Sequence, residues 1–148
     1  VRHAAKQGIR KSILGHAALL RKKHPDKHLV IIHDSLQTAD DGKLRDGATN
    51  NSTVTRALKL FNQHAKTTFD SVILIGQVTK NGDAAGTNKI IHDIDVHIHM
   101  YVDIKDKSET QGMRIIATKK NRYGYSGQAH ILSMWQDGLK EEGSLVED

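Results

Sequence analysis

The apolar residues of this chain gather into five segments that predict β-strands. Three of them have the continuous apolar character typical of a buried parallel sheet, and they cover residues 29–33, 71–78 and 113–118. The other two alternate apolar and polar residues with a period of two, over residues 94–102 and 128–134. We therefore expect the first, second and fourth strands to be buried and the third and fifth to be half exposed.

Two further segments have the 3.6-residue apolar period of amphipathic helices. The first runs from about residue 4 to residue 23 and is ended by Pro25. The second runs from about residue 53 to residue 66, with Ser52 or Asn51 as its N-cap. A helix between two strands implies a right-handed parallel crossover, whereas the later strands have connections too short for helices. The pattern predicts an α/β fold: a mainly parallel sheet with appended antiparallel or mixed C-terminal strands.

Composition excludes several classes of protein. The chain has 148 residues, of which 37% are hydrophobic, and it lacks any apolar run near the roughly 18 residues that a membrane span needs. The absence of Cys excludes a disulfide scaffold, thiolate zinc sites and cysteine nucleophiles, and it fits a reducing compartment such as the cytoplasm. The net charge of +5 favours a polyanionic partner such as nucleic acid, although basic faces are often only solvated.

Two long polar loops, over residues 37–51 and 79–89, each follow the C-terminal end of a predicted strand. Open α/β sheets bind ligands at that edge, and long loops in a compact domain are often functional. Each loop is expected either to contact a ligand or to be merely disordered.

The first two strands also end in residues that could carry chemistry. The first ends in Asp34 and Ser35, the layout of a Walker B segment, whose carboxylate holds the water shell of a nucleotide's Mg²⁺. Many strands end in Asp only because Asp begins turns, so the pattern alone leaves both interpretations open. Near the end of the second strand, the amide of Gln77 could hydrogen-bond a γ-phosphate or could simply be solvated.

A basic turn follows the strand at residues 113–118. It reads Lys-Lys-Asn-Arg-Tyr-Gly over residues 119–124. These cations could grip phosphates, and an Arg can do so through two hydrogen bonds at once. A solvated hairpin end is the alternative interpretation.

Four motifs occur in a fixed order along the chain. They are Asp-Ser-Leu-Gln-Thr at 34–38, Val-Thr-Lys-Asn-Gly-Asp-Ala-Ala-Gly at 78–86, His-Asp-Ile-Asp at 92–95 and Lys-Asn-Arg-Tyr-Gly at 120–124. They resemble the D-S-I-Q-T, V-T-K-x-G-x-x-A-G, H-M-V-D and K-N-R-F-G motifs of the bacterial RadA (Sms) family, the RecA-superfamily ATPases of recombination and DNA repair. The resemblance covers roughly residues 9–139, and the last motif is the most specific.

The resemblance implies a single RecA-like P-loop NTPase-type core domain over residues 1–148. Such a core assembles into a ring, hydrolyses ATP with Mg²⁺ and moves along single-stranded DNA during branch migration. Asp34, with Ser35 beside it, would bind the Mg²⁺ of the nucleotide through water. Gln77 would lie where RecA-like folds sense the γ-phosphate, although RadA proteins commonly have His there.

The same resemblance implies roles for two groups of cationic side chains. Lys120 and Arg122 would reach the nucleotide of the neighbouring subunit and stabilise the charge that develops on its γ-phosphate. Loops in the channel of the ring would bind DNA phosphates without reading sequence, through Lys43, Arg45, Lys80 and Lys89.

The chain departs from the family in one main respect, because it lacks the G-x-x-x-x-G-K-[ST] motif. The sequence begins at Val1 rather than at Met. We expect a core that lacks its N-terminal Walker A part. Such a core would be inactive alone and would be an ATPase when a P-loop segment completes it. A catalytically inactive RecA-like module that binds DNA or a partner is the alternative. A metal-dependent hydrolase is a third hypothesis, provided that a further ligand faces His97 and His99.

Overall fold

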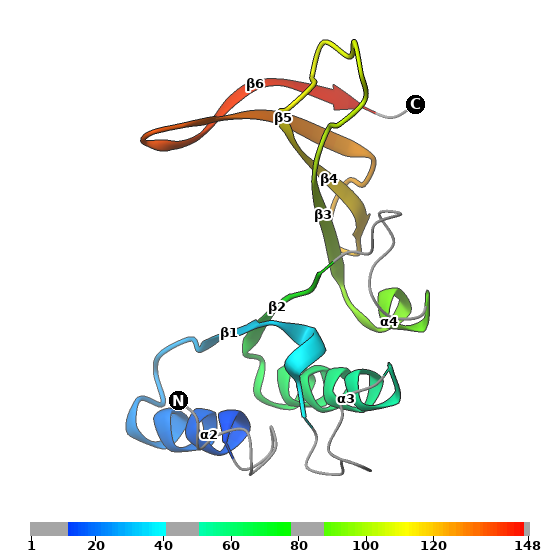
Figure 1. The fold of residues 1–148 in the computed structure, drawn as a ribbon. Helices are drawn as coiled ribbons and strands as arrows, with labels where there is room; N and C mark the ends of the chain where they lie inside the picture. Colours follow the sequence, from blue (N-terminus) through cyan, green and yellow to red (C-terminus); the bar gives the residue numbers. More distant parts are fainter. Residues whose placement is uncertain (1–11, 41–50, 78–87, 147–148) are drawn as a thin grey trace. The chain divides into compact units, whose positions relative to one another are not determined.

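The computed structural model describes residues 12–40, 51–77 and 88–146, and the chain divides into two compact units, Val1–Asp93 and Ile94–Asp148 (Figure 1). The predicted α/β class is confirmed. The prediction of a mainly parallel sheet is wrong for the described strands, since two strands pair in parallel and four form an antiparallel sheet. Within the described residues, no helix combines the length and the apolar character needed to cross a membrane.

The first unit contains most of the helical structure. Its elements are α2 (Ile13–Lys23), β1 (Val30–Asp34), the 3₁₀ helix η2 (Leu36–Thr38), α3 (Asn51–Thr68), β2 (Ser71–Ile75) and α4 (Asn88–Asp93). Strands β1 and β2 pair in parallel, with Val30 opposite Ser71 and Asp34 opposite Ile75. The predicted residues 4–11 of the first helix lie outside the described residues.

Helix α3 supplies the core of this unit. Val54, Ala57, Leu58 and Phe61 recur at helical spacing and are at most 5% exposed. Both α2 and α3 lie on one side of the β1–β2 pair (Figure 1), where Ile31 is also buried. The N-cap prediction was wrong, because α3 begins at Asn51 and contains Ser52 in its first turn.

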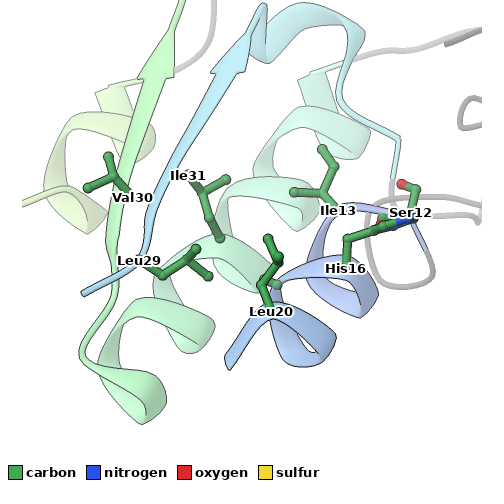
Figure 2. A pocket seen from close by; sticks show the side chains of 8 residues that line it. Ser12, Ile13, His16, Leu20, Leu29, Val30 and Ile31 are labelled. Carbon is green, nitrogen blue, oxygen red and sulfur yellow. The ribbon is translucent and has the colours of Figure 1, made fainter. Parts of the chain in front are cut away.

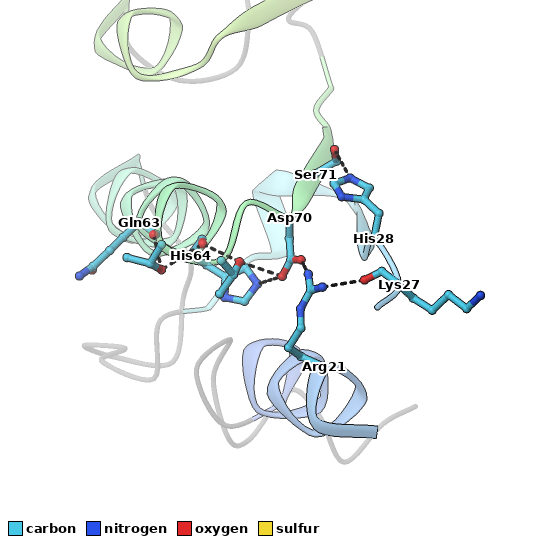
Figure 3. Close-up of polar contacts among 9 residues, drawn as sticks. Arg21, Lys27, His28, Gln63, His64, Asp70 and Ser71 are labelled. Carbon is cyan, nitrogen blue, oxygen red and sulfur yellow. Dashed lines mark hydrogen bonds and ion pairs between the residues drawn. The ribbon is translucent and has the colours of Figure 1, made fainter. Parts of the chain in front are cut away.

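A buried carboxylate joins the helices of the first unit to β2. Asp70 forms an ion pair with Arg21 of α2, and it is hydrogen-bonded to His64 Nε2 over 2.9 Å and to Thr68 Oγ1 over 2.8 Å (Figure 3). Arg21 also donates a 2.6 Å hydrogen bond to the carbonyl of Lys27. Burial, together with the nearby charge of Arg21, lowers the pKa of His64. His64 and Thr68 therefore hydrogen-bond to Oδ2 of this carboxylate, and Arg21 forms the ion pair with Oδ1.

The second unit is a four-stranded antiparallel sheet in the order β3-β4-β5-β6. Its strands are β3 (Val96–Val102), β4 (Arg114–Asn121), β5 (Gln128–Trp135) and β6 (Gly138–Val146). The continuous apolar character of residues 113–118 is typical of a parallel strand, but β4 pairs in the antiparallel direction, as the short connections of the later strands predicted. Its connection to β5 is a hairpin turn, which is too short for a parallel crossover. The buried core of this sheet consists of Ile115, Ala117 and Ala129.

The connection between β3 and β4 is organised by Asp103. Its carboxylate accepts hydrogen bonds from Thr110 Oγ1 at 2.6 Å, Ser108 Oγ at 2.7 Å and the Lys105 main-chain nitrogen at 3.0 Å. These hydrogen bonds, in that order of importance, lower the pKa of Asp103 from 3.8 to about 2. The charged carboxylate thus holds the loop in one conformation.

Candidate functional site

Asp34 is the last residue of β1 and is exposed at the carboxyl end of the parallel pair. Ser35 follows it through a cis peptide bond. The side-chain amide of Gln37 donates a 3.1 Å hydrogen bond to the main-chain carbonyl of Gln77, just beyond β2. This bond ties together the two segments that follow β1 and β2, so Asp34 and Gln77 leave the sheet at the same edge, where α/β sheets bind ligands.

The position of His33 accounts for the outward direction of the Asp34 carboxylate. Its ring packs against Phe61 of α3 with a centroid separation of 5.5 Å. Burial lowers the pKa of His33, and a hydrogen bond involving Ser35 and the charge of Asp34 oppose this effect only in part. Because neighbouring side chains of a strand point to opposite faces, a half-buried His33 directs Asp34 away from the helix and toward solvent.

The basic turn contains a close ion pair within the chain. Arg122 Nη1 lies 2.6 Å from Asp95 Oδ1, and the Arg122 main-chain nitrogen donates to the Asp95 carbonyl over 3.0 Å. The two side chains are 51% and 39% exposed. Lys120 precedes this pair in β4, opposite His97. Arg122 is therefore at the surface, as its predicted role requires, but it already has an acidic partner.

Asn121 fixes the shape of the same turn. Its Oδ1 accepts a 3.1 Å hydrogen bond from the main-chain nitrogen of Tyr123, and its Nδ2 donates over 3.2 Å to the carbonyl of Tyr125. A Cβ atom at Gly124 would lie 2.9 Å from Asn121 Nδ2, so this close approach favours glycine. The sequence motifs include Asn121 and Asp95, but their contacts in this turn and those of Tyr125 were not predicted, although an Asn and a Gly within one turn were a usable signal.

Most of the predicted DNA-binding residues lie outside the part of the chain that the structure describes. Lys43, Arg45 and Lys80 lie outside the described residues, and for Lys89 only the backbone is described, in α4. Their role in binding DNA stays a prediction.

The metal hypothesis requires a further ligand, which the described part of the chain does not supply. The rings of His97 and His99 stack along β3 with centroids 6.4 Å apart. Burial, together with the charges of His99 and Lys119, lowers the pKa of His97. Within the described ranges, no group of three or more His, Asp or Glu side chains could hold a metal ion.

The first unit also contains a shallow apolar depression between α2 and the beginning of β1 (Figure 2). Ile13, Leu20, Leu29 and Ile31 line it together with Ser12, His16, Ala17 and Val30. Its lining residues come from α2 and from the beginning of β1, whereas Asp34 ends that strand. The depression is therefore separate from the predicted nucleotide-binding edge.

Comparison with known proteins adds evidence of ancestry. No protein-family model matches the chain. A DNA repair protein RadA from Brucella abortus is 34% identical over 123 residues, and one from Chlamydia pneumoniae is 30% identical over 112. These alignments cover 80% and 76% of this chain. This chain is a relative of bacterial RadA. It spans 24% of the length of both RadA relatives, so the similarity covers only a part of RadA.

A third RadA sequence gives the same extent of similarity. The DNA repair protein RadA of Pseudomonas aeruginosa is 27% identical over 113 residues, which cover 76% of this chain and 24% of that RadA. The resemblance that the motifs indicated is therefore confirmed, and RadA is the reference for the chemistry proposed next.

Proposed function

We propose that this chain acts as a RadA-like component of ATP-dependent DNA recombination and repair. In this proposal it contributes the Mg²⁺-associated carboxylate Asp34 to a RecA-like core, and a ring of such cores moves single-stranded DNA during branch migration in the cytoplasm. The observation that carries the proposal is the exposed position of Asp34 at the carboxyl end of a parallel strand, beside the segment that contains Gln77.

The residues at this edge fit a hydrated magnesium ion. Mg²⁺ prefers oxygen ligands and keeps several of its waters, and an exposed carboxylate next to the Ser35 hydroxyl offers such oxygens. When bound, Mg²⁺ with ATP neutralises the charge of the phosphates. Asp34 would hold the ion through its water shell, and the Gln77 amide would donate a hydrogen bond to the γ-phosphate. The hydrogen bond from Gln37 to Gln77 supports this arrangement, because it holds the second segment against the first.

Lys120 and Arg122 act on the nucleotide of a neighbouring subunit. Their positive charges stabilise the negative charge that develops on the γ-phosphate in the transition state. Exposed ion pairs contribute only about 0–1 kcal/mol, so exchanging Asp95 for a phosphate costs Arg122 little. Lys43, Arg45, Lys80 and Lys89 bind the phosphates of the single-stranded DNA.

An exposed apolar face supports the idea that a P-loop segment completes the core. Parallel sheets are normally covered on both sides. Val30, Ile32, Ile73 and Ile75, all on one face of the β1–β2 pair, are between 45% and 65% exposed. A second layer on this face would bring the P-loop to the sheet that ends in Asp34.

The rival candidate is a catalytically inactive RecA-like module that binds DNA or a partner. The ion pair between Arg122 and Asp95 favours it, because that pair satisfies the proposed catalytic cation within its own chain. The absence of a Walker A motif from the 148 residues is equally compatible with this candidate.

The deciding experiment supplies the chain with a P-loop segment and measures ATP hydrolysis with and without single-stranded DNA. We expect turnover that needs Mg²⁺, rises with DNA and is lost in Asp34→Asn. Asp26→Asn is the matched control, because Asp26 is 75% exposed and lies after α2, away from the sheet edge. Turnover that survives Asp34→Asn would contradict the proposed role of Asp34. DNA binding without any turnover would favour the rival candidate.

A further inference from the structure

The turn between β4 and β5 presents two tyrosine rings to solvent. Tyr123 is 78% exposed and Tyr125 is 84% exposed. Aromatic rings contribute most when they are buried, and exposed ones in an ordered segment are typical of contact sites. These two rings are therefore candidates for contact with a ligand.

The backbone that carries the rings is held by several hydrogen bonds. Asn121 bonds to the main chain at Tyr123 and Tyr125, Arg122 donates to the carbonyl of Asp95, and the Gly127 nitrogen donates over 2.9 Å to the carbonyl of Thr118. An ordered turn loses little conformational entropy when a ligand binds. The backbone that carries the rings is thus pre-organised for contact.

The charges near the rings define the class of ligand. Residues 119–136 include Lys119, Lys120 and Arg122 and contain no Asp or Glu. Asp95 is the acidic partner that the structure places at Arg122. Flat rings beside cations suit a ligand that has both an aromatic ring and a phosphate, and nucleotides have both.

We propose that Tyr123 and Tyr125 form a stacking contact for a nucleobase whose phosphates meet the cations of the same turn. This inference rests on the proposed function for its choice of ligand, since that function supplies two sources of a base. One is single-stranded DNA, and the other is the adenine of ATP held by a second copy of the chain. Both sources present a base and a phosphate, and the experiment separates them.

The test measures binding of the 148-residue chain to three labelled probes by fluorescence anisotropy: a thymidine oligomer, an abasic oligomer of equal length, and ATP. In Tyr123→Leu/Tyr125→Leu, the thymidine oligomer should bind about ten- to a hundredfold more weakly. The dependence of its affinity on salt should stay unchanged, because phosphate contacts remain. The abasic oligomer should bind the variant and the unaltered chain equally. Tyr101→Leu is the control, since Tyr101 is 40% exposed but lies in β3.

Each outcome decides a separate question. A loss confined to ATP would identify the base as adenine, and a loss confined to the oligomer would identify it as DNA. Equal binding of all probes by the double variant and the unaltered chain would overturn the inference, as would an unaltered chain that binds no probe. If the rings prove necessary but the chain completed by a P-loop segment hydrolyses no ATP, the proposed function fails and the stacking contact stands.

Discussion

Arg122 and Asp95 are joined by a 2.6 Å ion pair and by a main-chain hydrogen bond between the same two residues. The main-chain bond holds the basic turn against the segment before β3, and the ion pair orients the guanidinium. Because both side chains are partly exposed, a phosphate can take the place of the carboxylate. Asp95 thus competes with any anionic ligand of Arg122.

Asp95→Asn should consequently strengthen the binding of nucleotide or DNA. The substitution removes the competing charge but leaves the main-chain carbonyl that accepts from Arg122. The energy of an exposed ion pair corresponds to an increase in affinity of up to about fivefold. Anisotropy titrations at low salt measure this. Asp106→Asn, an exposed site in the β3–β4 connection, should have no effect. Weaker binding by Asp95→Asn would show that Asp95 positions the turn for its ligand instead of competing.

Asp70→Asn should destabilise the first unit by about 3 kcal/mol, because it leaves a buried network without its charge. Urea unfolding followed by helical circular dichroism reports on this unit, which contains α2 and α3. The double variant Asp70→Asn/Arg21→Met should lose less stability than the two single variants lose in sum, since it no longer contains an unpaired Arg21 cation. Additive losses would contradict the described ion pair. Asp26→Asn should change stability by less than about 0.5 kcal/mol.

The second unit should lose stability in acid through Asp103. Its folded pKa of about 2 lies below the ordinary 3.8, so its contribution is complete above that ordinary value and disappears as the pH falls through about 2. Asp103→Ala should destabilise the unit at neutral pH, and the difference from the unaltered chain should shrink as the pH approaches 2. Trp135 fluorescence, from β5, follows this unit. A difference that does not change with pH would exclude the charged carboxylate as the cause, and Glu109→Gln is the control.

Sequence patterns predicted the elements whose packing is local. Continuous apolar runs found β1 and β2, and the 3.6-residue period found α3, because each buries one face against its neighbours. The direction of β4 was not predictable in this way, since apolar continuity reports burial and not strand polarity. Strand β6 was missed because it is rich in Lys, Glu and Gly, although the Asp137-Gly138 pair at its beginning is a common hairpin signal.

The candidate site could be predicted only in part for a similar reason. A strand that ends in Asp34 is visible in the sequence, and so is a turn of cations. The bond from Gln37 to Gln77 joins residues 40 positions apart, and the pair of Arg122 with Asp95 joins residues 27 positions apart. Such partners depend on the pairing of strands, which single-sequence patterns leave undetermined.

The central claim is that Asp34 and Arg122 serve one nucleotide from two different subunits. Its most direct test mixes Asp34→Asn chains with Arg122→Ala chains, each completed by a P-loop segment, and measures ATP turnover. Each variant alone should be inactive. A one-to-one mixture should recover about a quarter of the normal rate, because in a head-to-tail ring about one contact in four then has both intact residues. A mixture that stays as inactive as its components would contradict the claim.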